Sequence, residues 1–343
     1  MKKMFFTTLA MIALMACSGE DPVYWYDAGS SDGTAGGGVP YYPEKPSENG
    51  GNQGGSTDNG DQGGTNDGTQ EELTGGYTPE GYTLVWNDEF DSSSKLSSKW
   101  NFEVGGTGWG NNELQYYCAN GVYSPTGQKT ADVSDGTLKI KAYKIAKSQS
   151  SNNKEYISTR MNTKESWELG YIEMRAKLPT IKGCWPAFWM LPSDGPYDVM
   201  DPTGWGGEID LMEYVPNDNP RMLYFSAHSH NATAAAGKTT GYVDPATGKK
   251  YSYCQSTTLA TPEEWHCYGM EWTRDYIRGY LDGKEYFYAP NPSPDEVDPH
   301  SWPFDQGFYL KLNLAIGGSW GGTPAADFTE ATYEIDWVRV YQK

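Results

Sequence analysis

The sequence predicts an all-β fold, a sandwich or jelly roll of two curved antiparallel sheets. Short segments in which polar and apolar residues alternate recur along the chain, and clusters of Gly, Pro, Asn, Asp and Ser separate them. No long stretch carries apolar residues at the 3.6-residue period of a helix. Aromatic residues make up 14% of the chain, with 13 Trp and 26 Tyr, a composition typical of β-rich proteins.

The predicted strands follow one another through the folded region. The first, 83–90, runs into a turn, and the segment 137–143 alternates cleanly after a Ser-Asp-Gly turn. Further strands are expected at 170–178, 187–191, 208–214, 223–228, 265–272, 276–281, 308–315 and 333–341. Asp282 and Gly283 predict a two-residue hairpin turn between 276–281 and the segment around Tyr286.

The beginning of the chain predicts a lipoprotein leader. Residues 1–16 read as a signal peptide, with two lysines followed by an apolar run that is too short to cross a bilayer. The run ends in Leu-Met-Ala-Cys, which resembles the bacterial lipobox, so Cys17 is the expected site of lipidation. The alternative is an ordinary signal peptide followed by an unrelated cysteine.

A stalk is expected between this leader and the folded domain. Residues 17–78 are rich in Gly, Ser, Asn and Asp and almost free of aliphatic residues, so they cannot bury enough apolar surface to fold. The folded domain is expected at 79–343. The acidic residues just after Cys17 look like the surface-export signals of Bacteroidetes lipoproteins, which predicts an outer-membrane lipoprotein that faces the cell exterior.

Charge and cysteine spacing narrow the range of partners. The net charge of -19 argues against nucleic acid and anionic membrane surfaces, and it favours a neutral polymer over a strongly anionic one. Cys118, Cys184, Cys254 and Cys267 show no CxxC spacing, so a zinc site is not expected. Four cysteines allow three disulfide pairings, and buried free thiols explain them equally well.

The segment 208–214 carries the strongest candidate for chemistry. Glu208 and Asp210 share one face of a strand by simple alternation, whereas Glu213, five residues after Glu208, should face the other way. One β-bulge between Asp210 and Glu213 would return Glu213 to the acidic face. Carboxylates crowded on one face repel, which raises the pKa of at least one of them.

Glycosidases typically use two carboxyl groups, one as a proton donor and the other in its ionised form. The order along the strand suggests Glu208 as nucleophile and Glu213 as general acid/base, with Asp210 between them as a hydrogen-bond partner of Glu208. The alternative is a solvated acidic strand or a calcium site, because Asp and Glu often line exposed strand faces.

Six blocks of sequence resemble glycoside hydrolase family 16 in its laminarinase-like branch. They lie at 86–90, 108–117, 183–192, 208–213, 313–318 and 336–341, in the family's order and spacing. The resemblance implies a concanavalin-like β-jelly roll and retaining, endo-acting hydrolysis of β-1,3-glucan (laminarin) or mixed-linkage β-1,3/1,4-glucan. A non-catalytic surface glycan-binding protein and a hydrolase of another β-glycan, such as a β-galactan, remain alternatives. The segment 224–228 departs from the Gly-rich histidine strand that laminarinases often carry at this position.

The resemblance also implies residues that bind substrate. The candidates are five tryptophans, each of which serves either as a sugar-stacking platform or as core, and three polar residues: Trp109, Trp185, Trp189, Trp205, Trp320, Asn112, Arg160 and His228. Trp320 lies in the Gly-rich segment 317–322, which we expect to be a flexible loop at the rim of the cleft. Arg160 fits a donor-side sugar site or an ion pair within the sheet, and His228 fits a sugar ligand or a structural histidine.

The resemblance also implies a possible metal site, since many relatives in this family hold a structural calcium ion on the convex side of the sandwich. The matching positions are the carbonyls of Glu89 and Gly136 and the carboxylate of Asp336. Ordinary turn chemistry explains Gly136 equally well. No cofactor is expected for catalysis, and a monomer is expected. The sequence does not choose between laminarin and mixed-linkage glucan.

Overall fold

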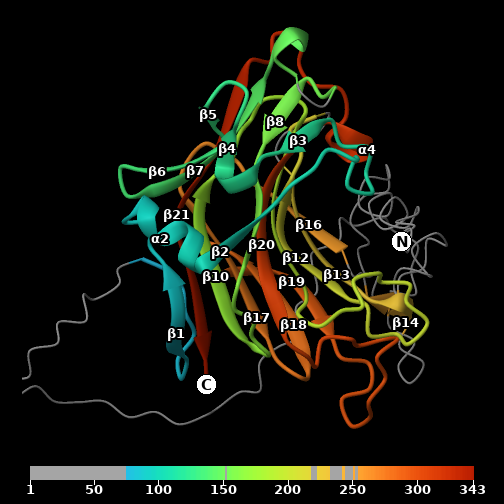
Figure 1. Cartoon of the computed structure of the whole chain (residues 1–343). Coiled ribbons are helices and arrows are strands. Elements are labelled where there is room, and N and C mark those ends of the chain that lie inside the picture. The colour runs from blue at the N-terminus through green and yellow to red at the C-terminus, as the bar shows by residue number, and fades with distance from the viewer. Residues whose placement is uncertain (1–74, 151–152, 218–221, 232–241, 244–249, 252–253) are drawn as a thin grey trace, which may run out of the picture. The chain divides into compact units, whose positions relative to one another are not determined.

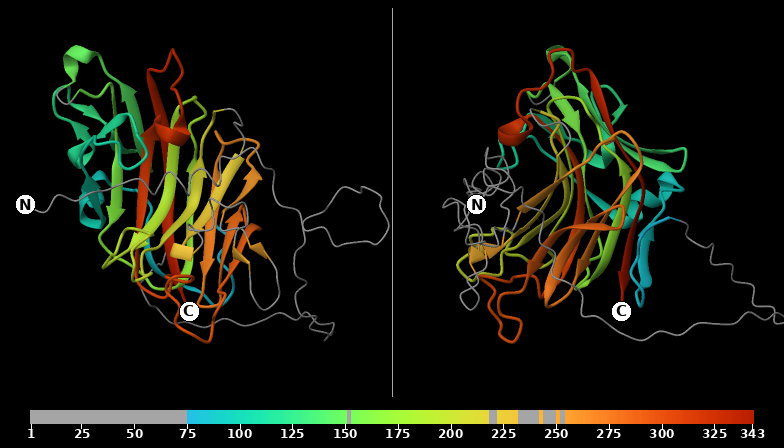
Figure 2. Two further views of the ribbon diagram at one scale, coloured as in Figure 1. Left: turned by 90° about the vertical axis from the view of Figure 1, so that its right-hand side faces the viewer. Right: turned by 180° about the vertical axis from the view of Figure 1, so that it is seen from behind.

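The computed structural model describes residues 75–150, 153–217, 222–231, 242–243, 250–251 and 254–343. The predicted leader, Cys17 and all but the last residues of the predicted stalk lie outside the described residues. The described part of the chain is dominated by strands, and two large sheets pack face to face (Figures 1 and 2). The predicted all-β sandwich is therefore confirmed.

One sheet contains seven strands and carries the acidic segment. In spatial order its strands are β16 (Cys254–Thr258), β13 (Met222–His228), β12 (Glu208–Tyr214), β11 (Cys184–Pro192), β20 (Phe308–Ile316), β9 (Arg160–Thr163) and β2 (Trp100–Glu103). Neighbouring strands of this sheet pair in the antiparallel direction. Strands from distant parts of the chain thus lie next to one another, with β11 between β12 and β20.

The second sheet contains ten strands. Eight follow the order β19 (Lys284–Pro290), β18 (Tyr276–Leu281), β17 (His266–Trp272), β10 (Gly170–Lys177), β21 (Glu330–Gln342), β7 (Thr137–Lys144), β8 (Tyr156–Ser158) and β3 (Gln115–Tyr117). In addition, β1 (Thr83–Asp88) pairs with β21, and β6 (Ala131–Ser134) pairs with β7.

Smaller elements complete the described structure. Two short hairpins pair β4 (Val122–Tyr123) with β5 (Gln128–Lys129) and β14 (Tyr242–Val243) with β15 (Lys250–Tyr251). The helices are α2 (Ser93–Lys99), α4 (Gly318–Gly321), and the 3₁₀ turns η1 (Ala119–Gly121) and η2 (Lys147–Gln149). No helix within the described ranges is long and apolar enough to cross a membrane.

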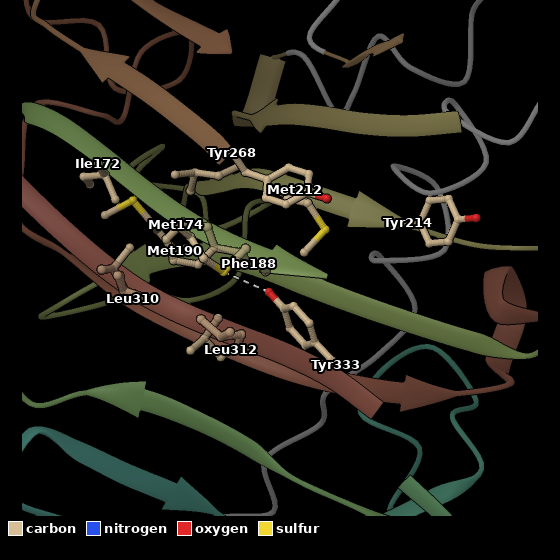
Figure 3. Packing of buried hydrophobic residues seen from close by; sticks show 14 of the residues in the cluster. Ile172, Met174, Phe188, Met190, Met212, Tyr214, Tyr268, Leu310, Leu312 and Tyr333 are labelled. Atoms are coloured by element: carbon tan, nitrogen blue, oxygen red, sulfur yellow. Dashed lines mark hydrogen bonds between the residues drawn. The ribbon is translucent and has the colours of Figure 1, made fainter. Parts of the chain in front are cut away.

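Alternate residues of both sheets fill the space between them. From the seven-stranded sheet, Phe188, Met212 and Leu312 point into this core, and Met174 and Tyr333 meet them from the other sheet (Figure 3). The Tyr333 hydroxyl lies 3.0 Å from the sulfur of Met174, so this buried polar group has a partner. Burial of one face of each sheet fixes which side chains of the seven-stranded sheet point outward.

Most predicted strands are present with similar bounds. The segments 208–214 and 276–281 match β12 and β18, and the turn at Asp282 and Gly283 has positive φ at both residues, as a type I′ hairpin requires. The helix α2 and short strands such as β2 and β9 were missed, because a few residues carry too little periodic signal. Cys118, Cys184 and Cys267 are buried free thiols, which excludes every disulfide between two of the four domain cysteines.

Candidate active site

The outward face of the seven-stranded sheet gathers the polar and aromatic residues that the core does not use. We call it the site face. Its members on five neighbouring strands include Glu208, Asp210, Glu213, His228, Trp185, Trp189, Lys311, Asn313 and Arg160. The intervening residues of the same strands, such as Ile209, Phe188 and Leu312, are fully buried in the core. Alternation alone therefore builds this face from strands that are far apart in sequence.

A β-bulge brings the third carboxylate onto the site face. Asp210 pairs with Ser226 and Glu213 pairs with Tyr224, so two residues of β12 stand opposite one residue of β13. The two residues that stand opposite one, Leu211 and Met212, are both fully buried in the core. The predicted bulge is confirmed by this register shift, and it lets two apolar side chains stay inside while Glu213 turns outward.

The three carboxyl groups differ in their electrostatic surroundings. Burial, and next the charge of Asp210, raise the pKa of Glu208 to about 7, although His228, Arg160 and Lys311 act in the opposite direction. Burial and the charge of Asp210 raise the pKa of Glu213 well above its ordinary value. Burial also raises the pKa of Asp210. Glu208 is thus the carboxyl that the nearby cations favour in its ionised form.

Glu213 lies in more apolar surroundings. The Trp185 indole nitrogen donates a hydrogen bond of 2.9 Å to Glu213 Oε1. Trp185 packs edge-on against Trp320 with ring centroids 5.4 Å apart, and Trp320 packs in the same way against Tyr224 at 4.9 Å. These buried rings exclude water from one side of Glu213, which favours its protonated form. The site face thus holds one carboxyl suited to keep a proton and one suited to lose it.

Asp210 has a different partner from the one the sequence suggested. His228 Nε2 lies 3.1 Å from Asp210 Oδ2, and both side chains are almost completely buried. One oxygen each of Glu208 and Asp210 and a ring nitrogen of His228 lie within 4.8 Å of one another. His228 is thus within ion-pair distance of Asp210, while Asp210 acts on Glu208 through its charge.

Two of the predicted tryptophans stand on the same outward row of β11. Trp185 and Trp189 pair with Ala315 and Lys311 of β20, so alternation places them on one face. Trp189 donates a hydrogen bond of 2.7 Å from its indole nitrogen to Asn313 Oδ1. Trp189 is partly exposed, whereas only 5% of the surface of Trp185 is exposed. Of this pair, Trp189 has more surface free to meet a ligand.

The expectation of a flexible loop at Trp320 is wrong. The segment Gly318–Gly321 forms the helical turn α4, and Trp320 is 8% exposed. Its contacts with Trp185 and Tyr224 account for that burial. Trp320 thus packs against Trp185 and has little exposed surface that could contact a ligand. Trp205 is half-buried, and its backbone carbonyl accepts a hydrogen bond from Gln306.

Arg160 forms the ion pair that the sequence left as one of two possibilities. Its Nε lies 2.7 Å from Glu103 Oε2 on the neighbouring strand β2. The guanidinium group also lies between two indole rings, 4.6 Å from the centroid of Trp109 and 4.8 Å from that of Trp189. Trp109 donates to the Gly105 carbonyl at 3.2 Å. Arg160 therefore fixes the positions of both rings on this side of the site face.

Sequence reasoning missed Glu103, Lys311 and Asn313. The strand β20 alternates Phe308, Leu310, Leu312 and Leu314 inward with Tyr309, Lys311, Asn313 and Ala315 outward. A lysine and an asparagine at alternate positions of an otherwise apolar strand would have placed both on the site face. For Glu103 no such signal exists, because β2 has only four residues.

Asn112 lies at the rim of the site face. It is exposed, and its side-chain nitrogen donates to Ser319 Oγ at 3.1 Å. Both residues line a shallow pocket of about 420 Å³ whose other lining residues are Leu114, Gly318, Gly322, Thr323 and Pro324. Near Asn112, Glu113 is buried and accepts hydrogen bonds from Gln115 at 2.6 Å and Tyr117 at 3.1 Å. Glu113 thus holds Gln115 and Tyr117 in place.

The three residues suggested for calcium lie on or beside the ten-stranded sheet. Asp336 supplies the only carboxylate of the set, and Arg175 Nη1 contacts its Oδ2. The Glu89 side chain pairs with Arg339, and Gly136 occupies a turn with a φ of 75°. A calcium ion at this place would have to compete with the Arg175 guanidinium for Asp336.

Comparisons with known proteins agree with this architecture. A family model described as "Beta-porphyranase A-D, GH16 domain" matches residues 84–343. A beta-glucanase of Rhodothermus marinus is 37% identical over 270 residues, which cover 76% of this chain and 85% of that protein. The laminarinase structure from the same organism superposes with a TM-score of 0.60 at 35% identity, over 76% of this chain and 97% of that one.

A second solved structure contains bound sugar. It is a mutant of SCLam, a non-specific endo-beta-1,3(4)-glucanase from family GH16, co-crystallised with 1,3-beta-D-cellobiosyl-cellobiose. Its TM-score is 0.62 at 34% identity, and the match covers 78% of this chain and 96% of that one.

Proposed function

This chain belongs to glycoside hydrolase family 16, and on that premise we propose that it is a retaining, endo-acting β-glucan hydrolase. The relatives described above are named glucanases and laminarinases, and the chain is accordingly a glycoside hydrolase. The proposed mechanism rests on one observation, which is that the carboxyls on β12 differ in how strongly their surroundings favour the protonated form. Glu208 is the one that nearby cations favour as an anion, and Glu213 is the one that burial keeps protonated.

The proposed reaction runs in two displacements. In the first, the Glu208 carboxylate attacks the anomeric carbon while the Glu213 carboxyl donates its proton to the departing glycosidic oxygen. In the second, ionised Glu213 takes a proton from water, the water oxygen bonds to the anomeric carbon, and the bond to Glu208 breaks. Glu213 then carries a proton again and Glu208 is ionised, so both groups return to their starting states.

Asp210 and His228 assist this cycle without reacting. Asp210 raises the pKa of Glu213, which keeps the proton on the donor until a substrate arrives. His228 lies 3.1 Å from Asp210 and acts on Glu208 in favour of its ionised form. Trp185 offers an N–H that remains bonded when Glu213 loses its proton, and this stabilises the charge that develops on Glu213.

The substrate proposed is β-1,3-glucan or mixed-linkage β-1,3/1,4-glucan. The names of the glucanase relatives support this choice, whereas the name of the matching family model points to porphyran as another β-glycan. A reducing-sugar assay on laminarin, barley β-glucan and porphyran separates these substrates. Release of reducing ends from either glucan would support the proposal, and activity on porphyran alone would replace it. Binding of glucan without hydrolysis would favour a glycan-binding protein.

Stereochemistry tests the proposed double displacement. A retaining enzyme produces the β-anomer first, because two inversions at the anomeric carbon restore its configuration. Proton NMR within seconds of mixing should therefore show the β-anomeric signal before mutarotation. An initial α signal would mean a single displacement by water and a different role for Glu208.

We propose in addition that Cys17 carries lipid and anchors the enzyme in the outer membrane, facing outward. The lipobox-like sequence supports this, and each buried CH₂ of a lipid chain contributes about 0.8 kcal/mol. Cys17→Ala should move the protein from the membrane fraction to the soluble fraction without loss of activity. Protease treatment of intact cells should remove the activity, whereas protection until the outer membrane is broken would indicate the periplasmic side.

A structural calcium ion at Glu89, Gly136 and Asp336 is the remaining proposal. Chelation should lower the melting temperature if the ion is bound and leave it unchanged if the Arg175–Asp336 contact occupies the place. Asp336→Asn separates the two cases, because it would abolish the effect of added calcium.

A further inference from the structure

The site face contains a buried lysine that the proposed mechanism does not use. Lys311 lies in the middle of β20 and is 1% exposed. Its neighbours across the sheet are Trp189 on β11 and Asn162 on β9. Lysine is seldom buried so completely unless its charge is paired, and its burial here at a sugar-cleaving face therefore needs an explanation.

Within the described residues, the one carboxylate in ion-pair contact with Lys311 also pairs with a second cation. The Lys311 ammonium nitrogen contacts Glu103 Oε1, and Arg160 pairs with the other carboxylate oxygen of Glu103. Two cations and one carboxylate leave one positive charge in excess when all three groups are ionised. Arg160 also acts on the buried carboxyl of Glu113, and both Arg160 and Lys311 act on Glu208.

Both cations lie beside the ring of Trp189, whose strand β11 lies between β20 and the carboxylates of β12. The Lys311 ammonium lies 5.0 Å from the Trp189 ring centroid, and the Arg160 guanidinium lies 4.8 Å from it. On the other side of Trp189 the sheet continues with Asp210, its pairing partner on β12, and Glu208 is two residues away on the same face. Lys311 and Asp210 are both almost completely buried, so charges here interact more strongly than at a surface.

The charged groups that act on Glu208 come from four strands. Asp210 opposes its ionisation, and His228, Arg160 and Lys311 favour it. Glu213 is the further carboxyl that interacts with Glu208 on the same strand. Burial and the charge of Arg160 lower the pKa of Lys311 to about 7, so its ammonium is charged in the acid range, where Glu208 would otherwise take up a proton.

We propose that Lys311 is a positioning residue whose ammonium group stabilises the ionised form of Glu208 and thereby sets the lower pH limit of activity. The inference rests on the proposed function in taking Glu208 as the nucleophile. Lys311 touches neither the reacting bond nor a proton in transit. It acts through its charge, and a lysine that only filled space between strands would have no such effect.

The test is a titration of the Glu208 carboxyl in the full-length protein. Glutamate labelled with ¹³C at the side-chain carboxyl gives a signal for each glutamate, and the signal lost in Glu208→Gln belongs to Glu208. In Lys311→Met, which keeps the apolar stem against Trp189, the pKa of Glu208 should rise by about one unit, the low end of what a close opposite charge contributes. The acidic limb of kcat/KM should move to higher pH by the same amount.

Matched variants separate charge from packing. Lys311→Arg restores a charge and should return the pKa of Glu208 to the wild-type value or below it. Lys129→Met removes an exposed lysine that pairs with Asp132 away from the site face, and it should shift nothing. If Lys311→Met does not fold, Lys311→Gln keeps a hydrogen-bond donor for Glu103 and replaces it in the same measurement.

The outcomes decide the inference in either direction. A raised pKa of Glu208 in the neutral variants, restored by arginine, supports it. An unchanged pKa in a folded Lys311→Met protein would overturn it and leave Lys311 a structural residue. The NMR titration needs no substrate. A wild-type enzyme inactive on glucan would thus refute the proposed function, while the role of Lys311 toward Glu208 would still be decided.

Discussion

Two glutamates on opposite sheets, the buried Glu271 and the half-buried Glu208, have opposite surroundings. Glu271, on β17 of the ten-stranded sheet, is 7% exposed and accepts hydrogen bonds from the hydroxyls of Tyr82, Tyr276 and Tyr280 at 3.1, 3.2 and 3.4 Å. Glu208, on the site face, has Asp210 as the neighbour that most opposes its charge. One carboxylate is surrounded by donors, and the other is placed beside a second acid.

The difference between the two glutamates shows that the fold is destabilised at the site face and not at Glu271. A buried carboxylate with several donors is compensated for the loss of water, whereas a carboxylate next to another carboxylate is not. Glu271 therefore contributes to folding, and Glu208 opposes it at neutral pH. Perturbed, poorly compensated acids of this kind are typical of catalytic sites.

The largest expected effect is on activity. Glu208→Gln and Glu213→Gln should each lower kcat by at least about 10²-fold, because each removes a nucleophile or a proton donor and keeps the shape of the side chain. The measurement is the initial rate of glucan hydrolysis for purified variants with unchanged circular dichroism.

Glu271→Gln is the matched control for this loss. It makes the same chemical change at a buried glutamate of the opposite sheet, and its activity should stay within about twofold of wild type. A large loss of activity in Glu271→Gln, or wild-type rates in either site variant, would remove the distinction between the two regions.

The second expected effect concerns stability, and its sign should differ between the two glutamates. The raised pKa of Glu208 means that the folded chain binds this proton more tightly than the unfolded chain. Stability therefore falls as the pH rises from the ordinary carboxyl value towards 7, by up to about 3 kcal/mol for a shift of this size.

Glu208→Gln removes this cost, so its melting temperature should exceed that of the wild type at pH values above about 7 and match it in acid. Glu271→Gln loses hydrogen bonds from tyrosine hydroxyls to a carboxylate, so its free energy of unfolding should fall by about 1–3 kcal/mol. Its melting temperature should therefore be lower than that of the wild type. Thermal melts of both variants in acid and in alkaline buffer make the comparison. A destabilised Glu208→Gln protein in alkaline buffer would show that Glu208 is compensated after all.

The smallest expected effect distinguishes two positions within the site face. Trp185 donates its N–H to Glu213, and that hydrogen bond favours the ionised carboxylate. In Trp185→Phe the pKa of Glu213 should rise further, and the basic limb of kcat/KM should move up by about one pH unit. Trp189→Phe loses an N–H bonded to Asn313 and should leave that limb in place. Equal shifts in both variants would indicate a general change in the site.

The sequence was sufficient for those features that depend on neighbouring residues. Alternation predicted the strand 208–214, and the odd spacing of Glu213 predicted the bulge that the register of β12 and β13 confirms. The turn at Asp282 and Gly283 was predicted for the same reason, since two residues with positive φ need a local signal only. The helical turn at Trp320 was missed because four residues rich in glycine resemble a loop.

The partners of the site carboxyls could not be predicted in this way. Glu103, Arg160 and Lys311 belong to β2, β9 and β20, and their contact depends on the order of strands in the sheet. The partner of Asp210 was assigned to Glu208 and is His228, which pairs with Glu208 in the strand register and reaches Asp210 with its side chain.

The sequence by itself determined which residues of each strand face outward, because the pleat of a strand is a local property with a period of two. Together with the predicted bulge, this alternation placed Glu208, Asp210 and Glu213 on one face. Only the tertiary structure decided which of these carboxyls is favoured as an anion. That choice depends on burial and on charges brought by distant segments, and both act through space and not along the chain.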